Sequence, residues 1–322
     1  ADRHGGHMPL DPILQQVLAA APPLVPEGAT PQQVRETLAA LAANPDLAEL
    51  APEVGSVSES GVPGPAGEIP VRIYRPEGTG PLPVVVFFHG GGWVIGSLET
   101  HDGSCRDLAN RVGCVVVSVD YRLAPEHPFP AGLEDGLAVT RWVLAHAAEL
   151  NADPTRVVVA GDSAGGNFAT VIAQQLAGEG GAAPSGQLLL YPATDMSHDY
   201  PSREAFGQGY FLDQASLELF VNCYVTDPAL VLDPRMSPLL HPKLAEAPPS
   251  VVVTAEYDPI RDQGNAYAEA LAAAGVPVEC RQFAGLVHGF LHFGAFVPAA
   301  KAATDEICAL LRTLLWGTGT QG

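Results

Sequence analysis

The feature that most constrains this chain is the pentapeptide Gly161-Asp162-Ser163-Ala164-Gly165. It follows an apolar, β-branched run at residues 156–160 and precedes residues 164–176, whose composition favours a helix. A serine between a strand and a helix, with glycine two positions before and after it, is typical of a nucleophile elbow, because only small residues fit so tight a turn. Such a turn lifts the serine hydroxyl clear of the sheet, beside the first amides of the helix.

A second motif lies upstream, at the end of another apolar run. Residues 84–88 are typical of a buried strand and lead straight into the sequence HGGGW at residues 89–93. Consecutive glycines let a backbone turn its N–H groups toward a ligand at close range. Acyl transfer needs such donors, because its tetrahedral intermediate carries an oxyanion. We therefore assign the N–H groups of Gly91, Gly92 and Ala164 to an oxyanion hole; the alternative is a glycine-rich surface turn.

Together the two motifs resemble the paired signatures of the bacterial hormone-sensitive-lipase-like (family IV) esterases of the α/β-hydrolase superfamily. Three further segments resemble the same family, namely DYRLAPEHPFPA at 120–131, YDPIRD at 257–262 and VHGF at 287–290. The resemblance extends from Met8 to about Leu315. It implies an α/β-hydrolase fold with a two-part cap, and a serine carboxylesterase that needs no cofactor and hydrolyses short- to medium-chain acyl esters.

The residues favour a catalytic triad independently of that resemblance. A serine hydroxyl needs a base to take its proton and an acid to orient the base, in the chain order serine, acid, histidine. Asp258 lies just past the end of a strand-like run at residues 250–255, where the sites of open α/β sheets gather. Asp262 is the competing acid, but it stands at an expected helix start before residues 265–274, where an N-cap role explains it.

The base is chosen among ten histidines. Only His288 and His292 follow Asp258 in the chain, and His288 comes soon after a strand-like run at residues 278–283, so it can reach over the edge of the sheet. His292 stands one helical turn further and is interpreted as a packing or surface histidine. We therefore expect Ser163 as nucleophile, His288 as base and Asp258 as the acid that orients it.

Composition limits the classes of function that are open to the chain. Its 16 basic and 36 acidic side chains give a formal net charge of −20, which disfavours nucleic acid as a partner. No apolar run reaches the roughly 18 residues of a membrane span. His288 and His292 are spaced like a zinc-binding pair, but Gly289 stands where that motif needs glutamate, so we expect no metal. Five cysteines without clustered spacing indicate a reducing compartment, and we expect a cytoplasmic protein.

The apolar runs predict the architecture. Residues 54–60 and 68–75 flank a turn and are typical of a β-hairpin. Six further strands are expected at residues 83–88, 114–119, 156–160, 187–191, 250–255 and 278–283. Near-continuous valine runs indicate strands that are buried on both faces. The sequence therefore predicts an eight-stranded, mostly parallel sheet flanked by helices, as an α/β hydrolase has.

The remaining segments divide the chain. Residues 1–7 resemble an expression-vector remnant. Residues 8–50 carry two helical patterns, the second of which opens on a capping box. Residues 193–249 are too long for a structureless loop. We expect them to form, with residues 8–50, the cap that the resemblance implies, over a catalytic domain of residues 51–192 and 250–322.

Aromatic side chains gather on the second cap segment, where a helix is expected to begin after Asp213. We expect them to line an acyl pocket together with the tryptophan of the glycine motif: Trp93, Phe206, Tyr210, Phe211, Phe220 and Tyr224. The alternative is a helix that only packs its apolar face on the domain.

Several residues are expected to support the site without reacting. His89 and Gly90 belong to the oxyanion loop. Asp162 and Glu126 are expected to hold that loop or the elbow. The alternative is that Asp120 and Arg122, at the end of the preceding strand, form purely structural ion pairs with their neighbours.

Two other classes of function remain open. A hydrolase of the same fold that acts on an amide or a lactone would share the triad and the oxyanion hole. A non-catalytic ligand receptor on this fold typically lacks the catalytic histidine, whereas His288 is present. The strand at residues 278–283 is the last in sequence and is expected at an edge of the sheet, which invites either pairing or protection. The family resemblance implies a homodimer through this edge; the alternative is that Glu279 and Arg281 protect it.

Overall fold

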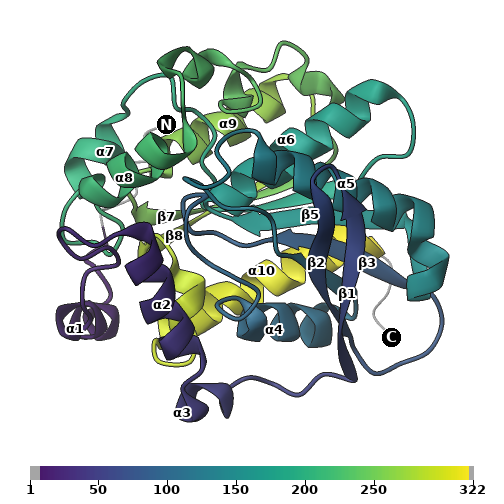
Figure 1. Cartoon of the computed structure of the whole chain (residues 1–322), viewed down its shortest axis with the longest axis horizontal. Coiled ribbons are helices and arrows are strands. Elements are labelled where there is room, and N and C mark those ends of the chain that lie inside the picture. The colour runs from purple at the N-terminus through teal and green to yellow at the C-terminus, as the bar shows by residue number, and fades with distance from the viewer. Residues whose placement is uncertain (1–7, 319–322) are drawn as a thin grey trace.

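The computed structural model describes residues 8–318, and the predicted vector remnant at residues 1–7 lies outside the described residues. One sheet of eight strands runs through the molecule, with helices on both of its faces (Figure 1). The strands are β1 (Ser56–Gly64), β2 (Gly67–Arg75), β3 (Leu82–Phe88), β4 (Val115–Val119), β5 (Ala152–Asp162), β6 (Gly186–Leu190), β7 (Ser250–Tyr257) and β8 (Val278–Val287).

Along the sheet the strands lie in the order β1-β2-β4-β3-β5-β6-β7-β8. β1 pairs antiparallel with β2 and β2 with β4, whereas all the other neighbours are parallel. The predicted hairpin is thus β1 and β2, and the predicted eight-stranded, mostly parallel sheet is confirmed. β8 lies at an edge of the sheet, as its place in the sequence indicated.

The helices alternate with the parallel strands. They are α1 (Pro12–Ala20), α2 (Pro31–Ala42), α3 (Pro45–Ala48), α4 (Asp102–Val112), α5 (Ala131–His146), α6 (Ala164–Glu179), α7 (Pro201–Phe206), α8 (Gln214–Tyr224), α9 (Arg261–Ala273) and α10 (Pro298–Trp316). Short 3₁₀ helices are η1 (Ala147–Leu150), η2 (Pro228–Leu232), η3 (Pro238–Leu240), η4 (Leu244–Glu246) and η5 (Phe290–Phe293). The predicted capping box opens α2 through Thr30 and Gln33, and the side chain of Asp213 caps α8.

Alternate residues of the central strands face two separate hydrophobic cores. In β3, Val84 and Val86 pack in the core that α5, α6 and α9 cover, while Val85 and Phe87 pack in the core that α4 and α10 cover. Every residue of β3, β4, β6 and β7 is buried. Burial on both faces explains why these strands are continuous apolar runs in the sequence rather than alternating patterns.

The strands β5 and β8 are among those that run further at their carboxyl ends than the sequence pattern indicates. β5 continues to Asp162 because this residue still pairs with Leu190 of β6, so the sharp turn starts only at Ser163. β8 continues to Val287, which pairs with the end of β7. Both extensions carry the chain directly to a predicted site residue.

The helices α1–α3 of residues 8–50 and the helices α7 and α8 of residues 193–249 lie on the left of the view in Figure 1. We call these two segments the cover. From α2, Arg35 Nε donates to the carbonyl of Val94, and at the end of α8 the carbonyl of Tyr224 accepts from the N–H of Phe129. Both contacts reach the loops that follow parallel strands. The division of the chain into a cap and a catalytic domain stays a prediction.

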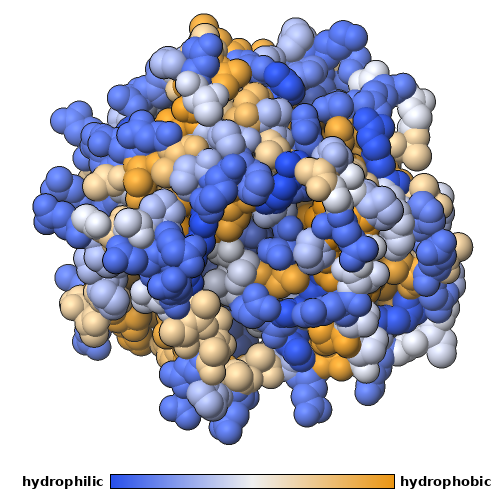
Figure 2. Space-filling model, in the orientation of Figure 1, coloured by the Kyte–Doolittle hydropathy of each residue, from blue (hydrophilic) through white to orange (hydrophobic). Residues whose placement is uncertain are grey.

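The surface in Figure 2 is mostly hydrophilic, with hydrophobic side chains in scattered patches on this face. Within residues 8–318, no helix is both long and apolar enough to cross a membrane. The five cysteines are free thiols, of which Cys105, Cys114 and Cys308 are buried.

Candidate active site

Four strands end immediately before a predicted site residue. β3 leads into His89, β5 into Ser163, β7 into Asp258 and β8 into His288. These four strands are parallel, so their carboxyl ends meet at one edge of the sheet. Sites of open α/β sheets form at this edge because the loops that follow the strands converge there.

The turn at Ser163 has the strained geometry of an elbow. Ser163 has φ 58° and ψ −116°, a backbone conformation that costs free energy for any residue with a side chain. The surroundings leave no room for a larger turn, since a Cβ atom at Gly165 would lie 1.8 Å from the carbonyl oxygen of Phe88. The N–H of Ser163 donates to the carbonyl of Leu190 at 2.8 Å, which ties the strained residue to β6.

Ser163, His288 and Asp258 lie in one hydrogen-bonded chain. The distance from Ser163 Oγ to His288 Nε2 is 2.8 Å, and that from His288 Nδ1 to Asp258 Oδ2 is 2.7 Å. The N–H of Ile260 donates to the other oxygen of Asp258 at 2.8 Å. Asp258 is fully buried and His288 is 6% exposed. With its Nδ1–H donated to the carboxylate, His288 presents the lone pair of Nε2 to the serine hydroxyl.

Asp262, the competing acid, lies elsewhere, and our interpretation of it as an N-cap was wrong. α9 begins at Arg261, Ile260 occupies the N-cap position, and no side chain bonds there. The carboxylate of Asp262 instead accepts the N–H of Ser202 at the start of α7, and Arg261 Nε donates to it. Asp262 therefore joins the cover to α9.

The glycine motif forms a tight turn beside the elbow. Gly91 has φ 125°, and its carbonyl accepts the N–H groups of Val94 and Ile95 at 3.0 and 2.9 Å. Within the described part of the chain, the N–H groups of Gly91, Gly92 and Ala164 make no backbone hydrogen bond. These donors remain available to a ligand, and their role as an oxyanion hole stays a prediction.

Asp162 holds the glycine motif in place. Its carboxylate accepts the N–H of Gly90 at 2.8 Å and lies 3.0 Å from His101 Nε2. Although burial opposes it, the neighbouring His101 and His292 lower the pKa of Asp162 below its ordinary value. Asp162 is predicted from the sequence but His101 is not, because no local motif links residues 61 positions apart.

His89 is a buried support beneath the same loop. Its ring stacks on Tyr121 with 4.3 Å between centroids, and the Tyr121 hydroxyl donates to the carbonyl of His89 at 2.6 Å. Burial, and after it the charge of His101, lowers the pKa of His89 to about 4. His89 is therefore a neutral structural group at neutral pH.

Glu126 supports the site only through a second residue. It forms an ion pair with Arg35 of α2, whose guanidinium also donates to the carbonyls of Val94 and Ala124, both at 2.7 Å. Val94 directly follows the glycine motif of residues 89–93. Arg35, which the sequence analysis missed, thus fastens the cover to the loop after the predicted oxyanion hole.

The aromatic residues that we expected in one pocket form two groups. Trp93 stacks on Tyr224 with 4.6 Å between ring centroids, and these two pack in the same core as Phe220. The other three, Phe206, Tyr210 and Phe211, pack with the opposite core.

Each aromatic group touches the site from a different side. A Cβ atom at Gly92 would lie 2.1 Å from Phe220 Cγ, and one at Gly289 would lie 3.0 Å from Phe211 Cε1. Phe220 therefore lies against the oxyanion loop, while Phe211 lies against the residue after His288. Whether either group lines an acyl pocket stays a prediction.

Comparison with known proteins agrees with this arrangement. A family model described as an alpha/beta hydrolase fold matches residues 85–292. Esterase LipI of Mycobacterium tuberculosis is 44% identical to this chain over 313 residues, which cover 96% of each protein. An ethyl acetate hydrolase of Pseudomonas putida is 43% identical over 236 residues, which cover 72% of this chain and 74% of that protein.

A solved structure gives the same result. The hyperthermophilic esterase from the archaeon Pyrobaculum calidifontis matches with a TM-score of 0.89 and 38% identity, covering 95% of this chain and 99% of that one. The family model spans most of the chain, and the relatives are similar well beyond the motifs alone. The chain therefore belongs to the α/β-hydrolase fold and, within it, to the hormone-sensitive-lipase-like esterase family.

Proposed function

We propose that this protein is a serine carboxylesterase that hydrolyses short- to medium-chain acyl esters. The observation that carries the proposal is the hydrogen-bonded chain from Ser163 through His288 to buried Asp258. It lies at the edge of the sheet where the glycine motif presents unbonded N–H groups. The names of the relatives, an esterase and an ethyl acetate hydrolase among them, support the same reaction.

The reaction proceeds in two halves. Ser163 Oγ attacks the acyl carbonyl carbon while His288 Nε2 takes the serine proton. Asp258 stabilises the imidazolium, and the N–H groups of Gly91, Gly92 and Ala164 stabilise the oxyanion. The C–O bond to the alcohol then breaks and His288 protonates the departing oxygen. In the second half, water attacks the acyl-enzyme while His288 takes its proton, and the carboxylic acid leaves as His288 returns the proton to Ser163 Oγ.

The alternative within this fold is hydrolysis of an amide or a lactone. The same groups serve all three reactions, but an amine leaves less readily than an alcohol, so an amidase must protonate its leaving group more strongly. Two features favour an acyl ester: the site is flanked by apolar aromatic groups, and a relative is named for ethyl acetate. A non-catalytic ligand receptor does not need the hydrogen bond between Ser163 Oγ and His288 Nε2, so this bond favours an enzyme.

A substrate panel tests the proposal. Purified protein is assayed with p-nitrophenyl esters from acetate to palmitate, with p-nitroanilides of matched acyl groups and with a set of simple lactones. We expect kcat/KM to be highest for esters from butyrate to about hexanoate and to fall beyond about C10, since a closed pocket gains about 0.8 kcal/mol per buried CH₂ only until it is full. Faster turnover of the anilides or lactones would replace the esterase assignment.

We further propose a homodimer through the edge of β8. Arg281 of this strand forms ion pairs with Glu279 and Glu306 of the same chain, so its charge is balanced within the chain and protects the edge poorly. Sedimentation velocity at micromolar concentration tests this, and a species of monomer mass only would contradict it.

The free cysteines support a location for the protein, and its net charge supports a class of partner. Five unpaired cysteines, one of them the exposed Cys280, suit a reducing compartment, and we propose the cytoplasm. The net charge of −20 supports a small ester rather than a nucleic acid as the partner. Cell fractionation with an antibody against the protein tests the location.

A further inference from the structure

Three side chains lie close together near the nucleophile, and the proposed reaction uses none of them as a reactant. They are His101 at the start of α4, Asp162 at the end of β5, and His292 in η5. His101 Nε2 lies 3.0 Å and His292 Nε2 lies 3.9 Å from the carboxylate of Asp162. The three ligand atoms all lie within 4.8 Å of one another.

Two imidazole nitrogens and one carboxylate oxygen form a ligand set that suits zinc and similar transition metals. In a tetrahedral zinc site, bonds of about 2.0–2.2 Å place neighbouring ligand atoms about 3.4 Å apart. The distances from His101 Nε2 and His292 Nε2 to the carboxylate of Asp162, 3.0 and 3.9 Å, lie on either side of this value. The ligand nitrogens of the two histidines are at most 4.8 Å apart, so binding zinc would bring them closer by at most about 1.4 Å. Such a shift is small for His292, which sits in a short 3₁₀ helix.

The burial of the three ligands fits an ion that enters from solvent. The side chains of His101 and Asp162 are 5% exposed, while that of His292 is 35% exposed. An ion can therefore reach the two buried ligands past His292, and a fourth position remains for water, as in open zinc sites.

His101 is already oriented as a ligand. The Thr100 hydroxyl donates to the carbonyl of Ser97 at 3.0 Å, so at 2.8 Å it accepts the Nδ1–H of His101. This leaves the Nε2 atom of His101 facing the carboxylate of Asp162. A ring nitrogen in that position needs a cation between it and the carboxylate, either a proton or a metal ion. Hydrogen bonding of the remote ring nitrogen is the usual way in which proteins orient a metal-binding histidine.

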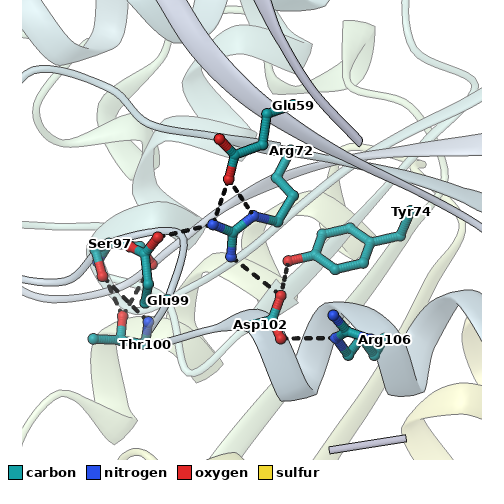
Figure 3. A network of polar contacts seen from close by, with 8 residues as sticks. All are labelled: Glu59, Arg72, Tyr74, Ser97, Glu99, Thr100, Asp102 and Arg106. Carbon is teal, nitrogen blue, oxygen red and sulfur yellow. Dashed lines mark hydrogen bonds and ion pairs between the residues drawn. The ribbon is translucent and has the colours of Figure 1, made fainter. Parts of the chain in front are cut away.

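A charged network fixes the segment that carries His101 (Figure 3). Arg72 of β2 donates to Glu99 at 2.8 Å and to Asp102 at 3.2 Å, on either side of Thr100 and His101. Asp102 also accepts the Tyr74 hydroxyl at 2.6 Å. Because β2 holds the segment at both ends, His101 keeps its direction whether or not an ion is bound.

We propose that His101, Asp162 and His292 bind a transition-metal dication, with Zn²⁺ as the preferred ion, and that the bound ion inhibits the hydrolase. The binding site stands on its own geometry, while the inhibition rests on the proposed function.

Inhibition follows from what surrounds the ion. Asp162 holds the N–H of Gly90, so a metal that draws on this carboxylate weakens the support of the oxyanion loop. His292 also lies next to the base, because its N–H donates at 3.0 Å to the carbonyl of Gly289, the residue after His288. A dication at this position disfavours the positive charge that His288 acquires in the transition state. Both effects lower kcat.

The test uses the full chain, freed of metal with a chelator that is then removed. Zn²⁺ binding is measured by calorimetry, and Co²⁺ is added separately because its visible absorption reports nitrogen and oxygen ligands directly. We expect one ion per chain at this site and a fall in kcat of about tenfold or more at saturation. Mg²⁺, which prefers oxygen ligands, should have no effect at equal concentration.

The decisive variant is His292→Gln, with His198→Gln as its matched control. His198 is an exposed histidine 3.3 Å from Asp195, and among residues 8–318 no third possible ligand completes this histidine–aspartate pair. We expect His292→Gln to weaken Zn²⁺ binding at least about tenfold and to remove the inhibition, with basal kcat within about twofold of the wild type. His198→Gln should bind Zn²⁺ as the wild type does.

Each outcome separates the two proposals. Equal Zn²⁺ affinity of the wild type and His292→Gln overturns the site. Binding that depends on His292 but leaves kcat unchanged overturns the inhibition. If the protein hydrolyses no ester, the proposed function fails, while the Co²⁺ spectrum of the wild type and of His292→Gln still decides the site.

Discussion

At the carboxyl ends of the parallel strands, the predicted reacting groups follow strand residues that are buried, whereas the cover approaches them on short helices. β3 and β7 are buried at every position, but α1 and α2 each bury a single residue, Leu14 and Val34. Packed strands hold atoms within hydrogen-bonding distance because neither core leaves them room to move. We therefore expect substitutions of the residues that follow the parallel strands to abolish hydrolysis, and substitutions in the cover to alter stability or specificity.

The largest effect is expected from Ser163→Ala, which removes the nucleophile and leaves the backbone of the elbow intact. We expect kcat to fall by about 10⁶ with an unchanged circular dichroism spectrum and melting temperature. The control is Ser216→Ala, a buried serine of α8 in the cover, which should retain activity within a few-fold. An active Ser163→Ala protein would refute the mechanism, and an inactive Ser216→Ala protein would refute the contrast between the two regions.

The next effect separates two aspartates that stand four residues apart. Asp258→Asn keeps the shape of the side chain but lets the wrong tautomer of His288 form, so we expect kcat to fall by about 10⁴. Asp262→Asn loses only bonds to Ser202 and Arg261 and should cost less than about tenfold. Steady-state kinetics of the two variants with p-nitrophenyl butyrate decide the matter, and the reverse order would make Asp262 the triad acid.

The residues at the carboxyl ends of the parallel strands could be predicted from the sequence far better than the contacts of the cover. The strands β3 to β7 are visible because each contains an apolar run, and Ser163 is visible because its turn requires glycine at fixed positions. Arg35 and His101 carry no such local signal, since their partners lie 59 and 61 residues away. The N-cap role of Asp262 was predicted wrongly for the same reason. Its partner Ser202 on α7 is 60 residues away in the sequence, whereas the start of a helix lies close by.

The cover is expected to depend on one fastening residue. Arg35→Ala removes charged hydrogen bonds to two backbone carbonyls and the ion pair with Glu126, so we expect the free energy of unfolding to fall by about 3–4 kcal/mol. Arg141→Ala breaks a pair with Glu179 in which both side chains are more than 40% exposed, and should cost less than about 1 kcal/mol. Urea denaturation followed by circular dichroism compares the two, and equal losses would show that Arg35 is not a fastening.

A smaller, pH-dependent effect is expected from His89 beneath the oxyanion loop. Its pKa is about 4 in the folded protein, against an ordinary value of 6.5, so the unfolded chain binds the proton more readily. Stability is therefore complete above about pH 6.5 and falls as the pH drops toward 4. Between pH 7.5 and 4.5 this residue should account for a loss of about 2–3 kcal/mol. His89→Asn should show a correspondingly smaller difference between urea denaturation at the two pH values; an identical difference would contradict the burial of a neutral histidine.

The smallest effect tests which aromatic group of the cover limits the acyl chain. Phe220 lies against Gly92 of the oxyanion loop, whereas Phe211 lies against Gly289 beyond His288. The acyl carbonyl must sit at the oxyanion hole, so we expect its chain to run past Phe220 and the alcohol to lie toward Phe211. Phe220→Ala should then favour longer acyl chains, each added CH₂ that fits the new space raising kcat/KM by about fourfold. Phe211→Ala should leave the acyl profile unchanged and improve esters of larger alcohols. Profiles over both series are needed, because a shift of the acyl optimum in Phe211→Ala alone would exchange the roles of the two aromatic groups.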